Sequence, residues 1–168
     1  MIDLSLFLAA LVAFRYGLSA LIGVDAKDEL DKKDNFAFGL AVGGGVLSLM
    51  LIMSGAVSGE AQASLLNEAF SVFIYGFLGI VLLKVGFFIQ DKILIRDISL
   101  SDEIRKGNLS AGIVTAVNLV AIGIIVRGAI YWSETNAIDG LLPVAIVYLM
   151  SQFILIGVTL LRTYIFGK

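Results

Sequence analysis

Apolar residues gather in five long stretches separated by short polar segments. Each stretch is close to the roughly 20 helical residues that cross a hydrocarbon core of about 30 Å. Their apolar runs are continuous, whereas a spanning β-strand would alternate apolar and polar positions. The pattern therefore predicts an all-α, polytopic membrane bundle of five transmembrane helices, at about 4–24, 36–57, 66–89, 109–132 and 141–161.

The first stretch has the features of a retained helix rather than of a cleaved signal peptide. It lacks a basic segment at its start, it carries Arg15 inside its apolar run, and it shows no small-residue cleavage site. We therefore expect this helix to stay in the membrane.

Basic residues lie almost entirely on one side of the predicted membrane. The connections after the first and third helices and the carboxyl-terminal tail carry nine, whereas the amino-terminal stub and the other two connections carry none. Because basic residues near span ends resist translocation, the amino terminus is expected outside and the carboxyl terminus in the cytoplasm. The outer side is acidic, with Asp3, Glu60, Glu68, Glu134 and Asp139.

Short sequence matches recur at an offset of 73 residues. Residues 34–39 match 107–112, and residues 53–56 match 126–129. Because each unit holds two spans, successive units enter the membrane in the same direction, which gives parallel two-helix repeats. The third unit keeps only its first helix, and the predicted units are 1–65, 66–132 and 133–168.

Composition agrees with a membrane protein and narrows the chemistry. The chain is 59% hydrophobic and 15% charged, against about 45–50% and about 25% in soluble domains. It contains neither Cys nor His, which excludes disulfides, thiol nucleophiles, His-based triads and the common zinc and haem sites. We expect a non-enzymatic protein without catalytic, cofactor-binding or metal-binding residues and without a nucleic-acid partner.

Polar side chains inside the predicted spans form a candidate intramembrane polar site. Such groups are costly in hydrocarbon, so each is expected to face the bundle, a water-filled cavity or a partner. A structural role remains open for each, through buried hydrogen bonds, snorkelling or an interfacial ion pair, beside a place on a polar pathway. The candidates are Arg15, Lys84, Asn118, Arg127 and Gln152, and the candidate outer acidic partners are Glu60, Glu134 and Asp139.

Other motifs predict helix starts and helix packing. Asn35 and Asn108 stand just before their spans, where an amide side chain caps free backbone N–H groups. Small residues on a membrane helix permit close approach of a neighbour. The candidate packing residues are Gly39, Gly43, Gly44, Gly45 and Gly112.

In each repeat, an apolar helix and a polar loop precede an Asn-led, small-residue-rich helix that ends in Gly-Ala. The residues concerned are Asp34, Asn35, Ala37, Gly39, Ser54, Gly55 and Ala56, then Gly107, Asn108, Ala111, Gly112, Arg127, Gly128 and Ala129. This pattern, over about 4–132, resembles the bacterial family called domain of unknown function 350, small inner-membrane proteins of tandem two-helix units. The resemblance implies a bacterial plasma-membrane location and a role near envelope stress or membrane remodelling. Four spans are usual in that family, so the fifth helix departs from its pattern.

Residues 91–106 alternate apolar and charged positions, which suits either an extension of the third span or a short helix on the inner leaflet. We expect this segment to be a docking surface for a cytoplasmic or membrane protein partner. Small-residue faces and the unpaired fifth helix predict a homo-oligomer in membrane lipid. The leading hypothesis is a scaffold or anchoring subunit; the alternative is an oligomeric ion or small-solute channel with an acidic outer rim.

Overall fold

The computed structural model describes residues 12, 27–58, 65–95, 98–133 and 137–166, and the regular elements in these residues are all helices. Among the described residues, four helices are long and apolar enough to cross a membrane: α2 (Phe36–Val57), α3 (Leu65–Ile89), α5 (Leu109–Tyr131) and α6 (Ala137–Phe166). The predicted all-α class is confirmed. The predicted span at 4–24 falls outside the described residues apart from Val12.

The four described spans lie close to their predicted positions. α2 has the predicted bounds, α3 begins one residue earlier, and α5 ends one residue earlier, with Trp132 as its C-cap. α6 differs because it extends beyond 141–161 at both ends. Pro143 lies inside this helix, in its second turn.

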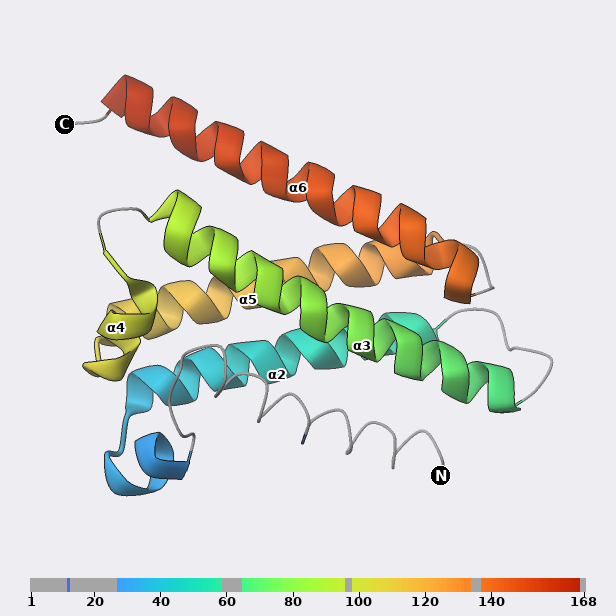
Figure 1. Ribbon diagram of the computed structural model, residues 1–168, viewed down its shortest axis with the longest axis horizontal. Helices are drawn as coiled ribbons and strands as arrows, with labels where there is room; N and C mark the ends of the chain where they lie inside the picture. Colours follow the sequence, from blue (N-terminus) through green and yellow to red (C-terminus); the bar gives the residue numbers. More distant parts are fainter. Residues whose placement is uncertain (1–11, 13–26, 59–64, 96–97, 134–136, 167–168) are drawn as a thin grey trace.

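Three shorter helical segments lie at one end of the bundle. η1 (Asp28–Lys32) precedes α2, η2 (Gln90–Leu94) continues α3 as a π-helical turn, and α4 (Leu100–Arg105) precedes α5. Figure 1 shows them at the end where α2 and α5 begin and α3 finishes. Both expectations for residues 91–106 are therefore met in part, since the segment first extends α3 and then forms a separate short helix.

α2 and α5 lie side by side and run in the same direction (Figure 1). Two glycines allow their backbones to approach closely. A Cβ atom added to Gly44 would lie 2.5 Å from the Cα atom of Ala116, and one added to Gly112 would lie 2.5 Å from the carbonyl oxygen of Ala37. A side chain at either position would force the two helices apart, which is the geometry expected of small-residue packing in membranes.

The same contact continues along the length of both helices. The Ser48 hydroxyl donates a hydrogen bond of 2.6 Å to the carbonyl oxygen of Leu119, and Ser48 also packs against Gly123. Further along, a Cβ atom on Gly55 would lie 3.1 Å from the carbonyl oxygen of Arg127. Close van der Waals contact and an interhelical hydrogen bond thus stabilise this pair together.

The other candidate packing glycines differ in their surroundings. Gly45 is buried. A Cβ atom on Gly39 would only touch the side chain of Leu30, at 3.6 Å, and one on Gly43 would meet no described atom within 4 Å. The expectation that Gly39 and Gly43 mediate close packing is therefore not met within one chain, because these two residues lie away from α5.

α3 contacts both α2 and α5, which places it over the pair they form (Figure 1). Gly79 faces Ile52 of α2, and Gly86 faces Ile122 of α5. The core of the bundle lies mainly between these three helices, and α4 and α6 also contribute to it. Its largest fully buried side chains are Phe38, Leu49, Ile52, Val72, Leu83, Ile104, Leu119, Ile122, Val126 and Tyr148.

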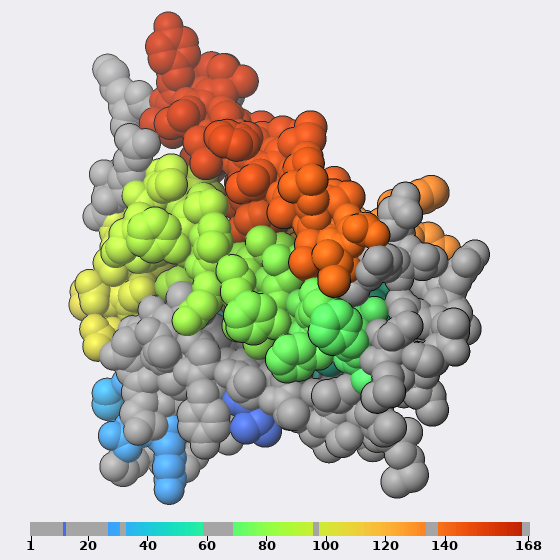
Figure 2. Space-filling view, turned by 45° about the vertical axis from the view of Figure 1, so that its right-hand side comes forward, coloured from blue at the N-terminus to red at the C-terminus, as the bar shows by residue number. Residues whose placement is uncertain are grey.

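α6 packs along only part of its length. In its first half Val144 and Tyr148 are buried, and the Tyr148 hydroxyl donates a hydrogen bond of 2.9 Å to the carbonyl oxygen of Leu82. Its second half diverges from α3 and α5 (Figures 1 and 2), and Phe153 and Tyr164 are among its many exposed residues. Only 17% of its apolar window is buried, against 50% for α2.

Candidate functional site

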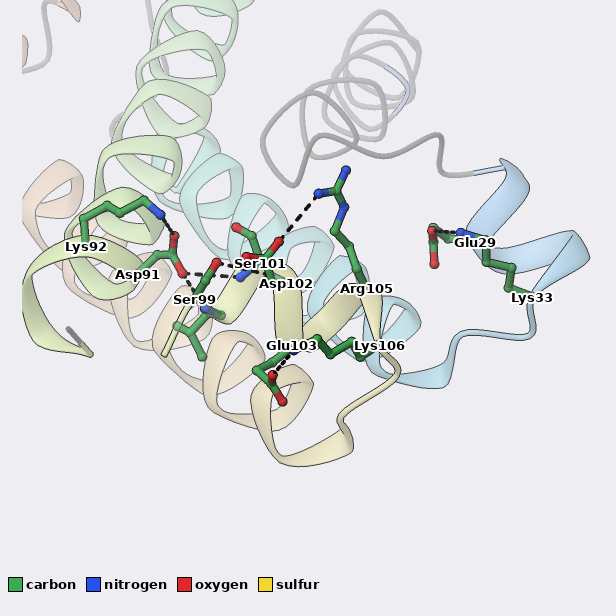
Figure 3. A network of polar contacts seen from close by, with 11 residues as sticks. Glu29, Lys33, Asp91, Lys92, Ser99, Ser101, Asp102, Glu103, Arg105 and Lys106 are labelled. Atoms are coloured by element: carbon green, nitrogen blue, oxygen red, sulfur yellow. Dashed lines mark hydrogen bonds and ion pairs between the residues drawn. The ribbon is translucent and has the colours of Figure 1, made fainter. Parts of the chain in front are cut away.

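The richest cluster of polar contacts lies at the end of the bundle formed by residues 27–35 and 90–108, here called the polar end (Figure 3). It contains η1, η2, α4 and the N-caps of α2 and α5. The charged residues that precede α2 and α5 meet here because α2 and α5 begin and α3 finishes at this end of the molecule (Figure 1).

Asn35 is the N-cap of α2 and the centre of one network. Its Oδ1 atom accepts a hydrogen bond of 3.1 Å from the Phe38 amide. Its Nδ2 atom donates to Glu29 Oε2 at 2.7 Å and to the Ile104 carbonyl oxygen at 2.8 Å. One buried amide therefore joins the neighbouring elements η1 and α2 to α4, where Ile104 is 69 residues away in sequence.

Glu29 is 2% exposed and completes this network. Its Oε1 atom lies 2.6 Å from Lys33 Nζ. Burial acts to raise the pKa of the Glu29 carboxyl group, but hydrogen bonds from Lys33 and Asn35, with the charges of Lys33 and Arg105, hold that pKa below its ordinary value. The carboxylate is thus ionised and fully engaged at neutral pH.

Asn108 forms a matching but exposed network at the start of α5. Its Oδ1 atom accepts from the Ser110 amide at 3.1 Å, and its Nδ2 atom donates to Glu103 Oε2 at 2.8 Å. Glu103 Oε1 lies 2.8 Å from Lys106 Nζ. The hydrogen bond from Asn108, and then the one from Lys106, lowers the pKa of Glu103.

The two networks also share a backbone feature. Asp34 and Gly107 stand directly before the two capping asparagines, with φ angles of 47° and 80°. Left-handed backbone at these positions turns the chain sharply into the helix that follows, and it suits glycine better than aspartate. The predicted capping asparagines are therefore placed by the same local turn in both cases.

Asp91 is a third organising residue, and it is 5% exposed. Its Oδ1 atom accepts from the backbone amides of Leu100, at 2.5 Å, and Ser101, at 3.3 Å, at the start of α4. Its Oδ2 atom lies 2.8 Å from Lys92 Nζ. A carboxylate at a helix amino terminus is stabilised by free N–H groups there, so Asp91 fixes α4 against the end of α3 (Figure 3).

We expect these carboxylates to make the fold sensitive to acid. The folded pKa values of Glu29 and Glu103 lie below 4.5, so their stabilising contribution is present above about pH 4.5 and is lost as pH falls through the folded pKa values. Glu29→Gln should lower the melting temperature near pH 6 and lose less stability than the unchanged chain on acidification to about pH 3. Thermal unfolding in detergent across this range measures both effects. A pH profile of Glu29→Gln that matches the profile of the unchanged chain would contradict the role given to Glu29.

The structure does not gather the predicted intramembrane polar residues into one site. Gln152 is buried in α6, Lys84 and Asn118 are half-buried in α3 and α5, and Arg127 is exposed. Within the described part of the chain, no hydrogen bond or ion pair joins any two of these four. Arg15 lies outside the described residues.

Three buried side-chain oxygens in the described spans and in η2 have no hydrogen-bond donor among the described residues: Gln90 Oε1, Thr115 Oγ1 and Gln152 Oε1. Gln90 does donate through Nε2 to the Val114 carbonyl oxygen, at 3.2 Å. A buried polar atom without a partner costs about 1–3 kcal/mol, so each of these oxygens destabilises the described bundle unless it gains a donor.

The structure describes one of the three candidate outer acids. Asp139 is exposed at the start of α6, whereas Glu60 and Glu134 lie outside the described residues. Among the described residues, no group of three or more Asp and Glu side chains has the arrangement of a metal site.

Sequence reasoning found the capping asparagines and missed the carboxylates that hold them. Glu29 precedes Asn35 by six residues, and Glu103 precedes Asn108 by five. A search for acids at similar distances before both caps would have identified them. Asp91 left no comparable signal, because its partners are backbone amides of a helix nine and ten residues away.

Comparisons with known proteins agree with these features. A family model described as Domain of Unknown Function (DUF350) matches residues 1–130 and, in a second match, residues 64–168. The chain is also similar to "UPF0719 transmembrane protein" of Aquifex aeolicus (strain VF5), with 31% identity over 121 residues. These residues are 72% of this chain and 45% of that protein, so the chain spans less than half of its relative's length. No solved structure matches the chain.

The resemblance seen in the two Asn-led helices is thus confirmed over the whole chain. Four described helices have the length and hydropathy of membrane spans, and the relative is itself named as a transmembrane protein. The chain is a transmembrane protein that belongs to the Domain of Unknown Function (DUF350) family.

Proposed function

We propose that this chain is a non-enzymatic, oligomeric protein of the bacterial plasma membrane that anchors or recruits a partner protein through residues 91–106. A role in envelope stress or membrane maintenance would suit such a scaffold. The observation that carries the proposal is the two-sided character of this segment. Asp91, Leu100 and Ile104 are buried and hold it against the bundle, whereas Lys92, Asp102, Arg105 and Lys106 are exposed.

The outward side of residues 91–106 carries positive and negative side chains on a fixed backbone. The side chains of Lys92, Asp102, Arg105 and Lys106 are 54%, 59%, 46% and 70% exposed. Exposed ion pairs such as Arg105–Asp102, at 3.6 Å, contribute only about 0–1 kcal/mol to stability. A partner can therefore replace them at little cost, and the fixed backbone limits the entropy lost on binding.

Neutralising this surface should release the partner. We expect Asp102→Asn/Arg105→Gln to lose a protein that co-purifies with the unchanged chain from mild-detergent membranes, because one exposed charge of each sign is removed from the surface while the buried residues stay. Asp139→Asn, at an exposed position elsewhere, should retain it. Quantitative mass spectrometry of the purified complexes makes the comparison. The absence of any stoichiometric partner of the unchanged chain, or its equal retention by both variants, would contradict the proposal.

We also propose that the polar end faces the cytoplasm, with the amino terminus outside. Nine bases on the connections and tail of this side, and none on the other, support this orientation. The chain has no cysteine, so a single cysteine introduced as Lys106→Cys or Ser58→Cys reports the orientation without labelling at other positions of the chain. An impermeant thiol reagent applied to intact cells should label the cysteine at 58 and spare the one at 106, and the reverse would overturn the orientation.

We infer that the chain is built from two-helix repeats. Three pairs of residues lie 73 positions apart, and the members of each pair have the same structural role. The pairs are Asp34 and Gly107, the two capping asparagines, and Lys33 and Lys106. The second match of the family model begins at residue 64, close to the proposed unit boundary at 65. In this scheme α2 and α5 are equivalent second helices, and α6 is the first helix of a third unit.

A second candidate function is an oligomeric ion or small-solute channel. The unsatisfied buried oxygens of Gln90, Thr115 and Gln152 favour it, since polar groups inside a membrane often line pathways. Reconstituted chain should then give a conductance that Gln152→Leu alters. Silent bilayers with assembled protein would exclude this function and leave the scaffold proposal standing.

A further inference from the structure

Three helices meet at Gly86 of α3. A Cβ atom added there would lie 3.1 Å from the Tyr148 hydroxyl of α6, and it would overlap the Ile122 Cδ1 atom of α5. α3 and α6 also touch nearer to their starts, where Gly140 lies against the Tyr75 hydroxyl. The two helices therefore run in the same direction, toward the polar end (Figure 1).

Beyond this contact, on the side of the polar end, each of the three helices carries a buried polar side chain. Gln90 follows Gly86 by four residues, and Gln152 follows Tyr148 by four residues, so each lies about one turn further along. α5 runs in the opposite direction, and Thr115 lies about two turns before its residue at the Gly86 contact, on the same face. Gln90, Gln152 and Thr115 are 5%, 4% and 0% exposed.

Two further contacts join these positions. The Gln90 Nε2 atom donates to the carbonyl oxygen of Val114, at 3.2 Å, so the Gln90 amide lies against the residue that precedes Thr115. α6 also contacts η2, the segment that Gln90 begins. The three buried side chains therefore lie around one junction of α3, α5 and α6, here called the polar junction.

Each residue of the polar junction has a buried oxygen without a hydrogen-bond partner among the described residues. Thr115 differs in this from the described threonines of α6. Thr159 donates to the Leu155 carbonyl oxygen, and Thr163 donates to the Thr159 carbonyl oxygen, each within its own helix. The Thr115 hydroxyl makes no such bond, so it is available to another partner.

We propose that the polar junction binds a water molecule, which donates to Gln90 Oε1 and Gln152 Oε1 and accepts from the Thr115 hydroxyl. A buried water typically makes about three hydrogen bonds to buried polar groups that lack other partners. The hydrogen-bonding capacities match, because an amide oxygen can only accept whereas a hydroxyl can also donate. Water is favoured over a metal cation because these three oxygens are uncharged. The proposal is independent of partner recruitment by residues 91–106.

The bound water joins α6 to the bundle at the point where this helix diverges. Beyond Gln152, the described residues of α6 are exposed or half-exposed. The Tyr148 hydroxyl bonds α6 directly to the Leu82 carbonyl oxygen, and the water adds a second polar link one turn further along. Loss of this link should therefore weaken the attachment of α6 to α3 and α5.

Thr115→Val gives results of opposite sign with and without the water. Valine has the shape of threonine without the hydroxyl, so removing a hydroxyl that has no partner should raise the melting temperature. Removing a hydroxyl that bonds to a water should lower it. Gln152→Leu breaks the same network, so Thr115→Val/Gln152→Leu should melt higher than the sum of the two single shifts predicts. Thr163→Val, at an exposed position, is the control and should combine additively with Gln152→Leu.

Nuclear magnetic resonance of the chain in lipid nanodiscs detects the water directly. The Thr115 methyl group should receive magnetisation from a water that stays bound as the particle tumbles, whereas a methyl group of the buried Val126 should not. Gln152→Leu should abolish this transfer. That variant keeps the Thr115 hydroxyl, so the loss excludes a relay through the exchanging hydroxyl proton.

A raised melting temperature in Thr115→Val, or the absence of magnetisation transfer in the folded, unchanged chain, would overturn the proposal. A melting temperature that rises with Na⁺ or K⁺, relative to choline at equal ionic strength, and does so only while Thr115 is present, would also overturn it. That result would identify the ligand as a monovalent cation.

Discussion

Replacing Gly112 with valine is expected to destabilise the fold strongly by forcing α2 and α5 apart. A Cβ atom at this position would lie 2.5 Å from the carbonyl oxygen and 2.9 Å from the Cα atom of Ala37, and both are backbone atoms of α2. No side-chain rotation relieves that overlap, so the helices must separate and lose the contact along their length. Overpacking of a core costs about 1–3 kcal/mol, and backbone overlap places this variant at or above the top of that range.

Reversible unfolding in mixed micelles, followed by circular dichroism, measures the loss. Gly157→Val is the matched control, because Gly157 is an exposed glycine of α6 with no described atom within 4 Å of an added Cβ atom. Its stability should change only by the difference in helix propensity, well below about 1 kcal/mol. Similar unfolding curves for the two variants would show that α2 and α5 are not held together as described.

The helices themselves could be predicted because their signals are local. The length of an apolar run decides whether a helix can span a membrane, and α2 was predicted at both ends. Capping is local too, since Asn35 and Asn108 bond amides two or three residues ahead. The longer extent of α6 was not predicted, because its ends contain polar residues that interrupt the apolar run without interrupting the helix.

The packing face could not be predicted from glycine spacing alone. Successive residues of an α-helix are about 100° apart, so the consecutive glycines at 43, 44 and 45 cover more than half of the circumference of α2. The spacing of Gly39 and Gly43 suggested one face, whereas the close contact with α5 uses Gly44. Comparing the two repeats identifies the packing face of α2 only once the structure shows which of the equivalent positions are buried.

Sequence analysis predicted which charged residues lie at the polar end, but it did not predict which of them contact one another. Charged residues between spans are usually solvated, so nothing in the sequence around Glu29 and Asp91 indicated that their side chains are buried. Their burial depends on partners supplied by tertiary structure, such as the carbonyl oxygen of Ile104, which lies 69 residues from Asn35 in sequence. For the same reason, the sequence does not show how the two caps differ. The network of Asn35 is covered by α4, whereas that of Asn108 is open to solvent.

This difference predicts unequal effects for the same substitution at the two caps. Asn108→Ala removes an exposed cap and should cost about 1 kcal/mol. Asn35→Ala removes the equivalent cap, and it also takes a donor from the buried carboxylate of Glu29 and the side-chain link to the Ile104 carbonyl oxygen, which keeps the Gly107 amide as a donor at 3.0 Å. A buried acceptor left unsatisfied costs about 1–3 kcal/mol, so the loss at Glu29 adds to that of the cap and the total should reach about 2–4 kcal/mol.

Asn35→Ser separates the two contributions to this loss. A serine hydroxyl can still accept from the Phe38 amide as an N-cap, but it is too short to replace the Nδ2 donor to both Glu29 and Ile104. Its free energy of unfolding should therefore lie nearer to that of Asn35→Ala than to that of the unchanged chain, whereas Asn108→Ser should be close to the unchanged chain. Equal losses at the two positions would mean that local capping, rather than the link between η1, α2 and α4, is what Asn35 contributes to the fold.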